Sequence, residues 1–145
     1  MLDIRGGTKR EALAQLSAPI ARRRSEIDPA ELLEALVKRE EASSTAIADG
    51  IAIPHAKVQH GDAVIASFGR SRTGIDFESV DGRPTQLFFV LVSPAGDPSL
   101  HVQWLAHIAG LLGNPYVREA LLEARTEDEV LEVLASEERE REAAT

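Results

Sequence analysis

Residues 43–58, SSTAIADGIAIPHAKV, decide the fold of this chain and contain its first candidate for chemistry. Ile51 and Ile53 alternate with small residues, which predicts a short and largely buried strand. Asp49-Gly50 predicts a turn just before this strand. Pro54 is expected to end the strand ladder, because proline has no N–H to donate and restricts the residue before it.

The residue that follows, His55, is therefore expected just beyond a strand end, on backbone with little freedom. Imidazole titrates near neutrality and is a good nucleophile once one ring nitrogen is deprotonated. His55 is thus a candidate for covalent chemistry. An ordinary surface histidine after a strand is the alternative, and the local pattern leaves both open.

The segment before this stretch predicts two helices. Thr8 and Glu11 have the spacing of a capping box, which starts the first helix, and Pro19 is expected to kink this helix or end it early. Asp28-Pro29 predicts the start of a second helix, which is expected to run to about residue 41. Its apolar face is formed by residues at helical spacing: Leu32, Leu33, Leu36 and Val37.

The segment after residue 58 predicts further strands. A polar loop through His60-Gly61-Asp62 is expected to lead to a strand over residues 63–70, with a turn at Thr73-Gly74 and another at residues 81–84. Residues 86–92, QLFFVLV, are the most apolar run in the chain. A run of this length without alternation is typical of a central strand covered on both faces.

Three more helices are expected toward the C-terminus. Asp97-Pro98 and Asn114-Pro115 each combine an N-cap with a proline at the first helical position, and residues 126–129 form a second capping box. His101 belongs to the apolar stripe of the first of these helices. The other apolar positions on the first and last of them are Leu105, Ile108, Leu112, Val130, Leu131 and Leu134. From Ser136 onward, a frayed helix end or a disordered tail is expected.

The composition fits a single α/β domain. The 145 residues suffice for a core without disulfides, and no repeat or long linker divides the chain. No apolar run reaches about 18 residues and no signal peptide is present, so membrane insertion is not expected. The lack of cysteine is compatible with a cytoplasmic location. Helices at both ends can cover a sheet formed between residues 45 and 93, which predicts an α/β fold.

Several classes of function are disfavoured. The net charge of −8 argues against nucleic-acid binding, and Arg22-Arg23-Arg24 is interpreted as a solvated helix end, with a docking patch as the alternative. His55 and His60 lie on a loop, and His101 and His107 point to different sides of a helix, so a preformed metal site is not expected. A P-loop, a Rossmann glycine pattern and a Gly-x-Ser-x-Gly motif are also absent from the sequence.

One set of residues could serve phosphoryl transfer: Arg39, His55 and His101. An imidazole nitrogen of one histidine would attack phosphorus, and the arginine would hold the equatorial oxygens with two hydrogen bonds. His101, in the first turn of its helix, would add a donor beside N–H groups that favour an anion. A packing role for His101 and a solvent-facing position for Arg39 are the alternatives.

A signature spans residues 39–55: Arg39-Glu40, then Thr45 before a glycine-rich turn at Gly50, then Ala-Ile-Pro-His ending at His55. It resembles the enzyme IIA domains of the bacterial phosphoenolpyruvate-dependent sugar phosphotransferase system (PTS). The type is fructose/mannitol, which includes the nitrogen-regulatory IIA proteins. The family's usual Thr-Gly is Thr45-Ala46 here. Val80-Asp81-Gly82 before an apolar strand, and a helix-opening histidine at position 101, also match. The resemblance covers about residues 8–134.

The resemblance implies a three-layer α/β/α sandwich around a mixed sheet, formed by one EIIA domain over residues 1–145. It implies that His55 accepts a phosphoryl group from the phosphocarrier HPr or its nitrogen-branch counterpart, and that Arg39 and His101 stabilise this group. Supporting roles fall to Thr45, Gly50 and Pro54. No metal or other cofactor is implied, because the donor is itself a protein phosphohistidine. Which imidazole nitrogen of His55 reacts depends on hydrogen bonds that a sequence does not specify.

Two functions would share this site. A transport phosphocarrier would pass the phosphoryl group to a IIB permease component. A regulatory protein would bind transporters, kinases or other targets according to its phosphorylation state. No fused IIB or IIC domain is expected, since the chain ends soon after its last helix, and this mildly favours regulation. A purely structural relative is the third alternative, which the complete set Arg39, His55 and His101 disfavours.

Overall fold

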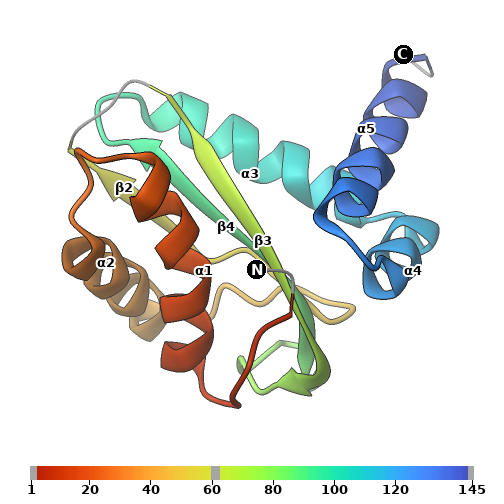
Figure 1. The fold of residues 1–145 in the computed structure, drawn as a ribbon, viewed down its shortest axis with the longest axis horizontal. Helices are drawn as coiled ribbons and strands as arrows, with labels where there is room; N and C mark the ends of the chain where they lie inside the picture. Colours follow the sequence, from red (N-terminus) through yellow and green to blue (C-terminus); the bar gives the residue numbers. More distant parts are fainter. Residues whose placement is uncertain (1–2, 60–62, 144–145) are drawn as a thin grey trace.

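A computed structural model describes residues 3–59 and 63–143 of the chain. Two helices, four strands and three helices follow one another in these ranges, in the order that the sequence predicts (Figure 1). The helices are α1 Lys9–Arg23, α2 Pro29–Ala42, α3 Pro98–Leu112, α4 Pro115–Glu123 and α5 Glu127–Ala143. The strands are β1 Ile51–Ala52, β2 His55–Val58, β3 Ile65–Ile75 and β4 Thr85–Pro94.

Strand β4 is the centre of the sheet. β1 and β2 pair with it in parallel, and β3 pairs with its other edge in the antiparallel direction. Residues 88, 90 and 92 of β4 pack in a cluster with α1 and α2, whereas residues 87, 89 and 91 pack in a cluster with α3, α4 and α5. The expected central strand, covered on both faces, is therefore confirmed, as is the three-layer α/β/α sandwich around a mixed sheet.

Strands β1 and β2 form one line along the same edge of β4. Ile51 pairs with Leu87 and His55 pairs with Leu91, so the register is the same on both sides of Pro54. Pro54, which is expected to end the ladder, only interrupts it, and its carbonyl accepts a hydrogen bond from Leu91 N at 2.9 Å. The ladder therefore resumes at His55, which is the first residue of β2, so the expected position of His55 just beyond a strand end is wrong. The predicted polar loop can begin only after Val58. Residues 60–62 of that loop lie outside the described residues.

Strand β3 is longer than expected, because it continues through Thr73-Gly74, where the sequence predicted a turn. Its ladder with β4 is irregular between Arg70 and Ile75. Gly74 has a φ of 85°, and a Cβ there would lie 2.7 Å from the Pro84 side chain. The glycine therefore allows an irregular strand instead of ending it. The later turn is present, since Gly82 N donates to Ser79 O at 3.0 Å.

Helix α1 begins with the predicted capping box, in which Thr8 and Glu11 each accept a hydrogen bond from the other's backbone. Of the kink or early end expected at Pro19, the early end is wrong, since the helix continues to Arg23. Leu16 and Ile20, on either side of the proline, are buried in the core, and this packing holds the helix together. Helix α2 starts at Pro29 as predicted, although the Asp28 side chain makes no capping hydrogen bond.

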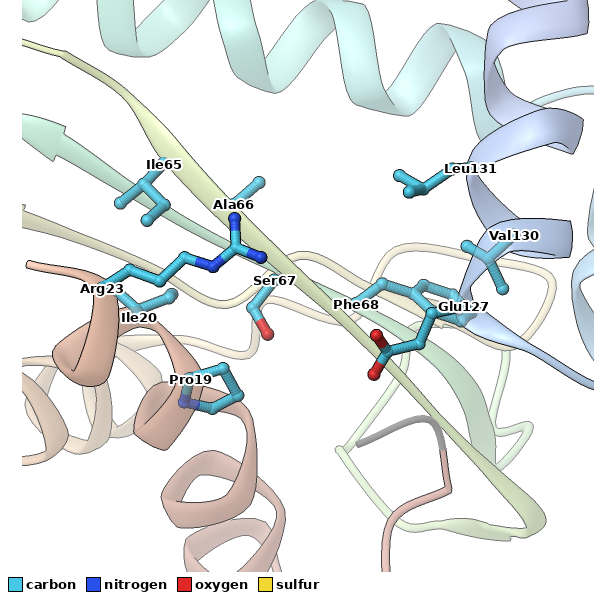
Figure 2. A pocket seen from close by; sticks show the side chains of 10 residues that line it. All are labelled: Pro19, Ile20, Arg23, Ile65, Ala66, Ser67, Phe68, Glu127, Val130 and Leu131. Carbon is cyan, nitrogen blue, oxygen red and sulfur yellow. The ribbon is translucent and has the colours of Figure 1, made fainter.

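The frayed helix end or disordered tail expected from Ser136 onward is wrong, since α5 continues to Ala143. Contacts with the neighbouring helices hold it: Asn114 Nδ2 donates to Glu137 Oε2 at 3.2 Å, and Arg141 Nη1 donates to Gly110 O at 3.1 Å. Leu131, expected on its apolar face, is 63% exposed. It lines an open groove where α1 and α5 flank β3 (Figure 2).

Arg70 of β3 is buried and ties distant parts of the chain together. Its Nε donates to Asp3 Oδ1 at 2.7 Å, and its Nη1 donates to Leu121 O at 2.8 Å and Leu122 O at 3.0 Å. The guanidinium thus satisfies the last carbonyls of α4, which have no partner within their own helix.

Arg70→Met should lower the free energy of unfolding by about 2 kcal/mol, because two carbonyls at the end of α4 lose their donor. Urea unfolding followed by circular dichroism measures this change. Arg72→Met is the matched control, since the Arg72 side chain is 60% exposed, and it should stay within about 0.5 kcal/mol of the parent. Equal losses in the two variants would contradict the assignment.

Candidate active site

Three elements bring Arg39, His55 and His101 together. Arg39 lies in the last turn of α2, His55 is the first residue of β2, and His101 lies in the first turn of α3. All three line one hollow of about 590 Å³, together with Lys57 and Leu105. Residues that are far apart in the sequence thus share one site, as the phosphoryl-transfer hypothesis requires.

The hydrogen bonds of His55 define its tautomer. Nδ1 lies 2.8 Å from Ile53 O, and Nε2 lies 3.1 Å from Arg39 Nε. A carbonyl oxygen can only accept and an arginine nitrogen can only donate, so the proton sits on Nδ1 and the lone pair on Nε2. Nε2 is therefore the nitrogen available to form a new bond.

Ser43 holds the side of the Arg39 guanidinium that does not contact His55. Arg39 Nη1 donates to Ser43 O at 2.9 Å and contacts Ser43 Oγ at 3.3 Å, just beyond the end of α2. These bonds use one side of the planar guanidinium and turn its Nε edge toward His55. The structure therefore replaces the solvent-facing alternative for Arg39 with a defined position beside the His55 ring.

His101 is 5% exposed and lies against the His55 ring, with 5.0 Å between the ring centroids and an angle of 57° between the planes. Its Nδ1 is hydrogen-bonded to Ser93 Oγ at the end of β4. Sequence reasoning missed Ser93. The available signal was a hydroxyl side chain directly after the apolar run 86–92.

Sequence reasoning also missed Lys57, which lines the same hollow. Residues two apart on a strand point to the same face, so its position after His55 was the available signal. Lys38 and Arg39 add positive charge to this hollow. A chain with a net charge of −8 thus has a locally cationic site that suits an anionic group.

The environment lowers the pKa of both histidines. Burial is the main cause of the lowered pKa of His55, and the charges of Arg39 and Lys57 add to it. Burial also lowers the pKa of His101, followed by the influence of His55, Lys57 and Arg39. Both rings are therefore neutral at neutral pH, and His55 Nε2 keeps its lone pair.

Thr45, Gly50 and Pro54, which the sequence analysis assigned supporting roles, make backbone hydrogen bonds next to the site. Thr45 O accepts a hydrogen bond from Ile53 N at 3.1 Å. Gly50 has a φ of 77° and starts the parallel ladder, since its carbonyl accepts from Gln86 N at 2.9 Å. Pro54 separates β1 from β2. Of these, none is among the residues that line the hollow.

Of the other two histidines, the structure describes only His107, which does not line the hollow. His107 lies 3.2 Å from Glu138 and its ring contacts Trp104, while His60 lies outside the described residues. Within residues 3–59 and 63–143, no group of three or more His, Cys, Asp or Glu side chains could hold a metal ion. No helix in these ranges has the length and hydrophobicity needed to cross a membrane.

Comparisons with known proteins agree with this geometry. The PTS fructose-specific EIIABC component of Bacillus subtilis is 41% identical over 101 residues, which are 70% of this chain and only 16% of that protein's length. The nitrogen regulatory protein of Pseudomonas aeruginosa is 32% identical over 134 residues, which are 92% of this chain and 87% of that protein.

Solved structures show the same fold. The nitrogen regulatory protein IIA-Ntr from Neisseria meningitidis superimposes with a TM-score of 0.84 at 29% identity, over 92% of this chain and 90% of that one. The mannitol enzyme IIA of Escherichia coli, solved in complex with phosphorylated enzyme IIB, gives a TM-score of 0.77 at 24% identity, over 94% and 93% of the chains. This second likeness concerns the fold alone.

The family profile described as "Phosphoenolpyruvate-dependent sugar phosphotransferase system, EIIA 2" matches residues 1–137. EIIA domains are phosphotransferase components of this system, and the mannitol complex is one case in which a IIA domain binds a IIB component. The profile match, the relatives and the fold agree with the site geometry. This chain therefore belongs to the type 2 EIIA family of the phosphoenolpyruvate-dependent sugar phosphotransferase system.

Proposed function

We propose that residues 1–145 act as one EIIA domain, a cytoplasmic phosphocarrier that becomes phosphorylated on His55. HPr or its nitrogen-branch counterpart is the donor, and a IIB component is the acceptor. One observation carries this proposal: the bond between His55 Nδ1 and Ile53 O leaves the Nε2 lone pair beside Arg39, in a cationic hollow. The fructose-specific relative, whose name combines A, B and C components, supports a IIB acceptor.

The proposed transfer needs no proton movement at the reacting nitrogen. The lone pair of His55 Nε2 forms a bond to phosphorus while the bond from phosphorus to the donor's histidine nitrogen breaks. The donor nitrogen keeps the electron pair of the broken bond. The Nδ1–H group keeps its hydrogen bond to Ile53 O, and this bond stabilises the ring as it becomes positively charged. Transfer to the acceptor repeats these steps in the opposite direction.

Arg39 changes partners during this step. Its Nε now donates to the lone pair that must attack, so the approaching phosphorus displaces that hydrogen bond. The same donor then lies beside the oxygens of the transferred group, where positive charge stabilises it. His101 contributes from its position beside the His55 ring, with its Nδ1 hydrogen-bonded to Ser93.

Regulation by phosphorylation state is the second candidate function. The nitrogen regulatory relative matches nearly the whole chain and most of its own length, whereas the fructose-specific relative matches a shorter stretch at higher identity. Both functions use the same phosphorylation of His55. They differ in what the phosphorylated and unphosphorylated forms bind.

Reconstitution tests the proposal. The purified chain is incubated with phosphoenolpyruvate, enzyme I and HPr, and separately with the nitrogen-branch donor pair, before intact-mass analysis. A gain of one phosphoryl group is expected, and the faster donor identifies the branch. Mixtures without enzyme I are the control, and no gain with either donor set would refute the phosphocarrier function.

His101→Ala should still bind the phosphodonor but should accept the phosphoryl group about 100-fold more slowly, because one group beside the transition state is lost. Rapid-quench kinetics at several donor concentrations separate the rate from the affinity. His107→Ala, which removes a histidine on the same helix away from the hollow, is the matched control. An unchanged rate in His101→Ala would return His101 to a packing role.

The lowered pKa of His55 predicts how phosphorylation depends on pH. The reactive form is the neutral ring, so His55 should stay reactive at pH values below the ordinary histidine pKa of 6.5 and lose reactivity only as it becomes protonated. NMR titration of the His55 ring measures this pKa directly. Arg39→Ala should raise it, because one of the charges that lower it is removed. A His55 pKa at or above 6.5 in the parent would contradict this prediction.

A further inference from the structure

Glu40 is a buried carboxylate that the proposed reaction does not use. Its side chain is 3% exposed, and it lies in the last turn of α2, where the helix dipole disfavours negative charge. Burial adds a further cost to a charged group. A carboxylate at this place is stabilised only if its partners are numerous and well placed.

Its partners are Thr45, five residues along the chain, and Lys9 of the distant helix α1. Thr45 donates from both its N–H and its Oγ1 to Glu40 Oε2, the first at 3.0 Å, and Lys9 Nζ donates to Oε1 at 3.1 Å. All of these groups are donors, which matches the acceptor-only chemistry of a carboxylate. Lys9 is itself held over the Phe77 ring, at 5.3 Å from its centroid.

A continuous hydrogen-bonded path leads from Glu40 to the reactive ring. Thr45 O accepts from Ile53 N at 3.1 Å, and Ile53 O in turn lies 2.8 Å from His55 Nδ1. Residues 45–47 and 51–53 form a tight antiparallel pair, closed at its other side by Ile47 N donating to Ile51 O at 2.9 Å. Glu40 therefore holds one side of a hairpin whose other side presents the carbonyl that orients His55.

We infer that Glu40 is a positioning residue: with Lys9 as its counter-ion, it fixes Thr45 and, through the Thr45–Ile53 pair, the carbonyl that selects the Nδ1–H tautomer of His55. Glu40 does not line the hollow, so it acts without touching the phosphoryl group. Two neighbouring residues of α2 thus have separate roles. Arg39 contacts the His55 ring directly, whereas Glu40 acts on it through the backbone of Thr45 and Ile53. The catalytic meaning of this role rests on the proposed function.

The experiment measures the tautomer and the transfer rate separately. Long-range proton–nitrogen NMR spectra of protein with nitrogen-labelled histidine, recorded at a pH at which His55 is neutral, report which ring nitrogen carries the proton. The signals that are missing in His55→Ala are those of His55. The parent is expected to be mainly Nδ1–H. In Glu40→Gln, which removes the charge but keeps the size, the two tautomers should become mixed. Transfer should slow about tenfold, at an unchanged half-saturating donor concentration.

Glu41→Gln is the matched control, because it removes a charge from the next residue, which is exposed. It should change neither readout. Should Glu40→Gln fail to fold, Thr45→Val decides the question, since it removes one donor to Glu40 at nearly constant volume. Thr45→Ser keeps the hydroxyl and should restore the parent tautomer.

The two proposals fail in distinguishable ways. A folded Glu40→Gln or Thr45→Val variant with the parent tautomer would overturn the positioning role, whatever its transfer rate. A parent chain that accepts no phosphoryl group would refute the phosphocarrier function, yet the tautomer measurement would still decide whether Glu40 orients His55.

Discussion

His55→Ala should accept no phosphoryl group from either donor pair, whereas the parent chain should gain one. His55 Nε2 is placed for attack by two hydrogen bonds, with the proton on Nδ1 and an arginine beside the lone pair. His101 is not expected to replace it, because its side chain is only 5% exposed. The loss should therefore be complete, as measured by intact mass under conditions that preserve acid-labile phosphate.

The control for this variant is His107→Ala, which removes an exposed histidine outside the hollow and should leave phosphorylation intact. Nitrogen NMR of the phosphorylated parent adds a second test, since the phosphoryl group should be on Nε2. Full phosphorylation of His55→Ala would refute the assignment of the residue. A phosphoryl group on Nδ1 would refute the tautomer argument while leaving the residue in place.

The sequence predicts best where a local signal has one structural solution. Proline after an N-cap residue fixes the starts of α2, α3 and α4, and the apolar run 86–92 becomes the buried central strand. In each case the information lies within a few residues. Tertiary packing then confirms what the local pattern indicates.

Predictions fail where a partner far along the chain decides. Thr73-Gly74 has turn composition, but pairing with β4 carries the strand through it. Pro19 does not end α1, because buried neighbours hold the helix on both sides. The strand that begins at His55 forms because β4 extends far enough to pair with residues 55–58, from Leu91 to Pro94. A local pattern contains no information about such partners.

The site shows the same division. Arg39, His55 and His101 follow from residue chemistry together with the family resemblance, and the structure places them around one hollow. Ser93 and the His55 tautomer depend on where the end of β4 and the Ile53 carbonyl lie in space. Chemistry-bearing residues can therefore be named from the sequence, whereas their protonation and mutual support require the fold.

Arg39→Ala should slow phosphoryl transfer to His55 about 1000-fold while leaving the chain folded and still able to bind its donor. Arg39 is a charged group in direct contact with the attacking nitrogen, with Nε 3.1 Å from His55 Nε2. Stabilisation by an arginine is a large part of catalysis in phosphoryl transfer. Arg39→Lys should recover only a small part of the rate, because one ammonium group cannot replace a planar fork held by Ser43. Rapid-quench measurements with a phosphorylated donor give these rates.

Lys38→Ala is the matched control, since Lys38 precedes Arg39 on α2 and its charge borders the same hollow. If general positive charge were sufficient, Lys38→Ala and Arg39→Ala would slow transfer to similar extents, and Arg39→Lys would restore the parent rate. Either result would refute a specific role for the guanidinium. A large loss in Arg39→Ala alone, with poor rescue by lysine, would instead show that the transferred group is held by the shape of the arginine as well as by its charge.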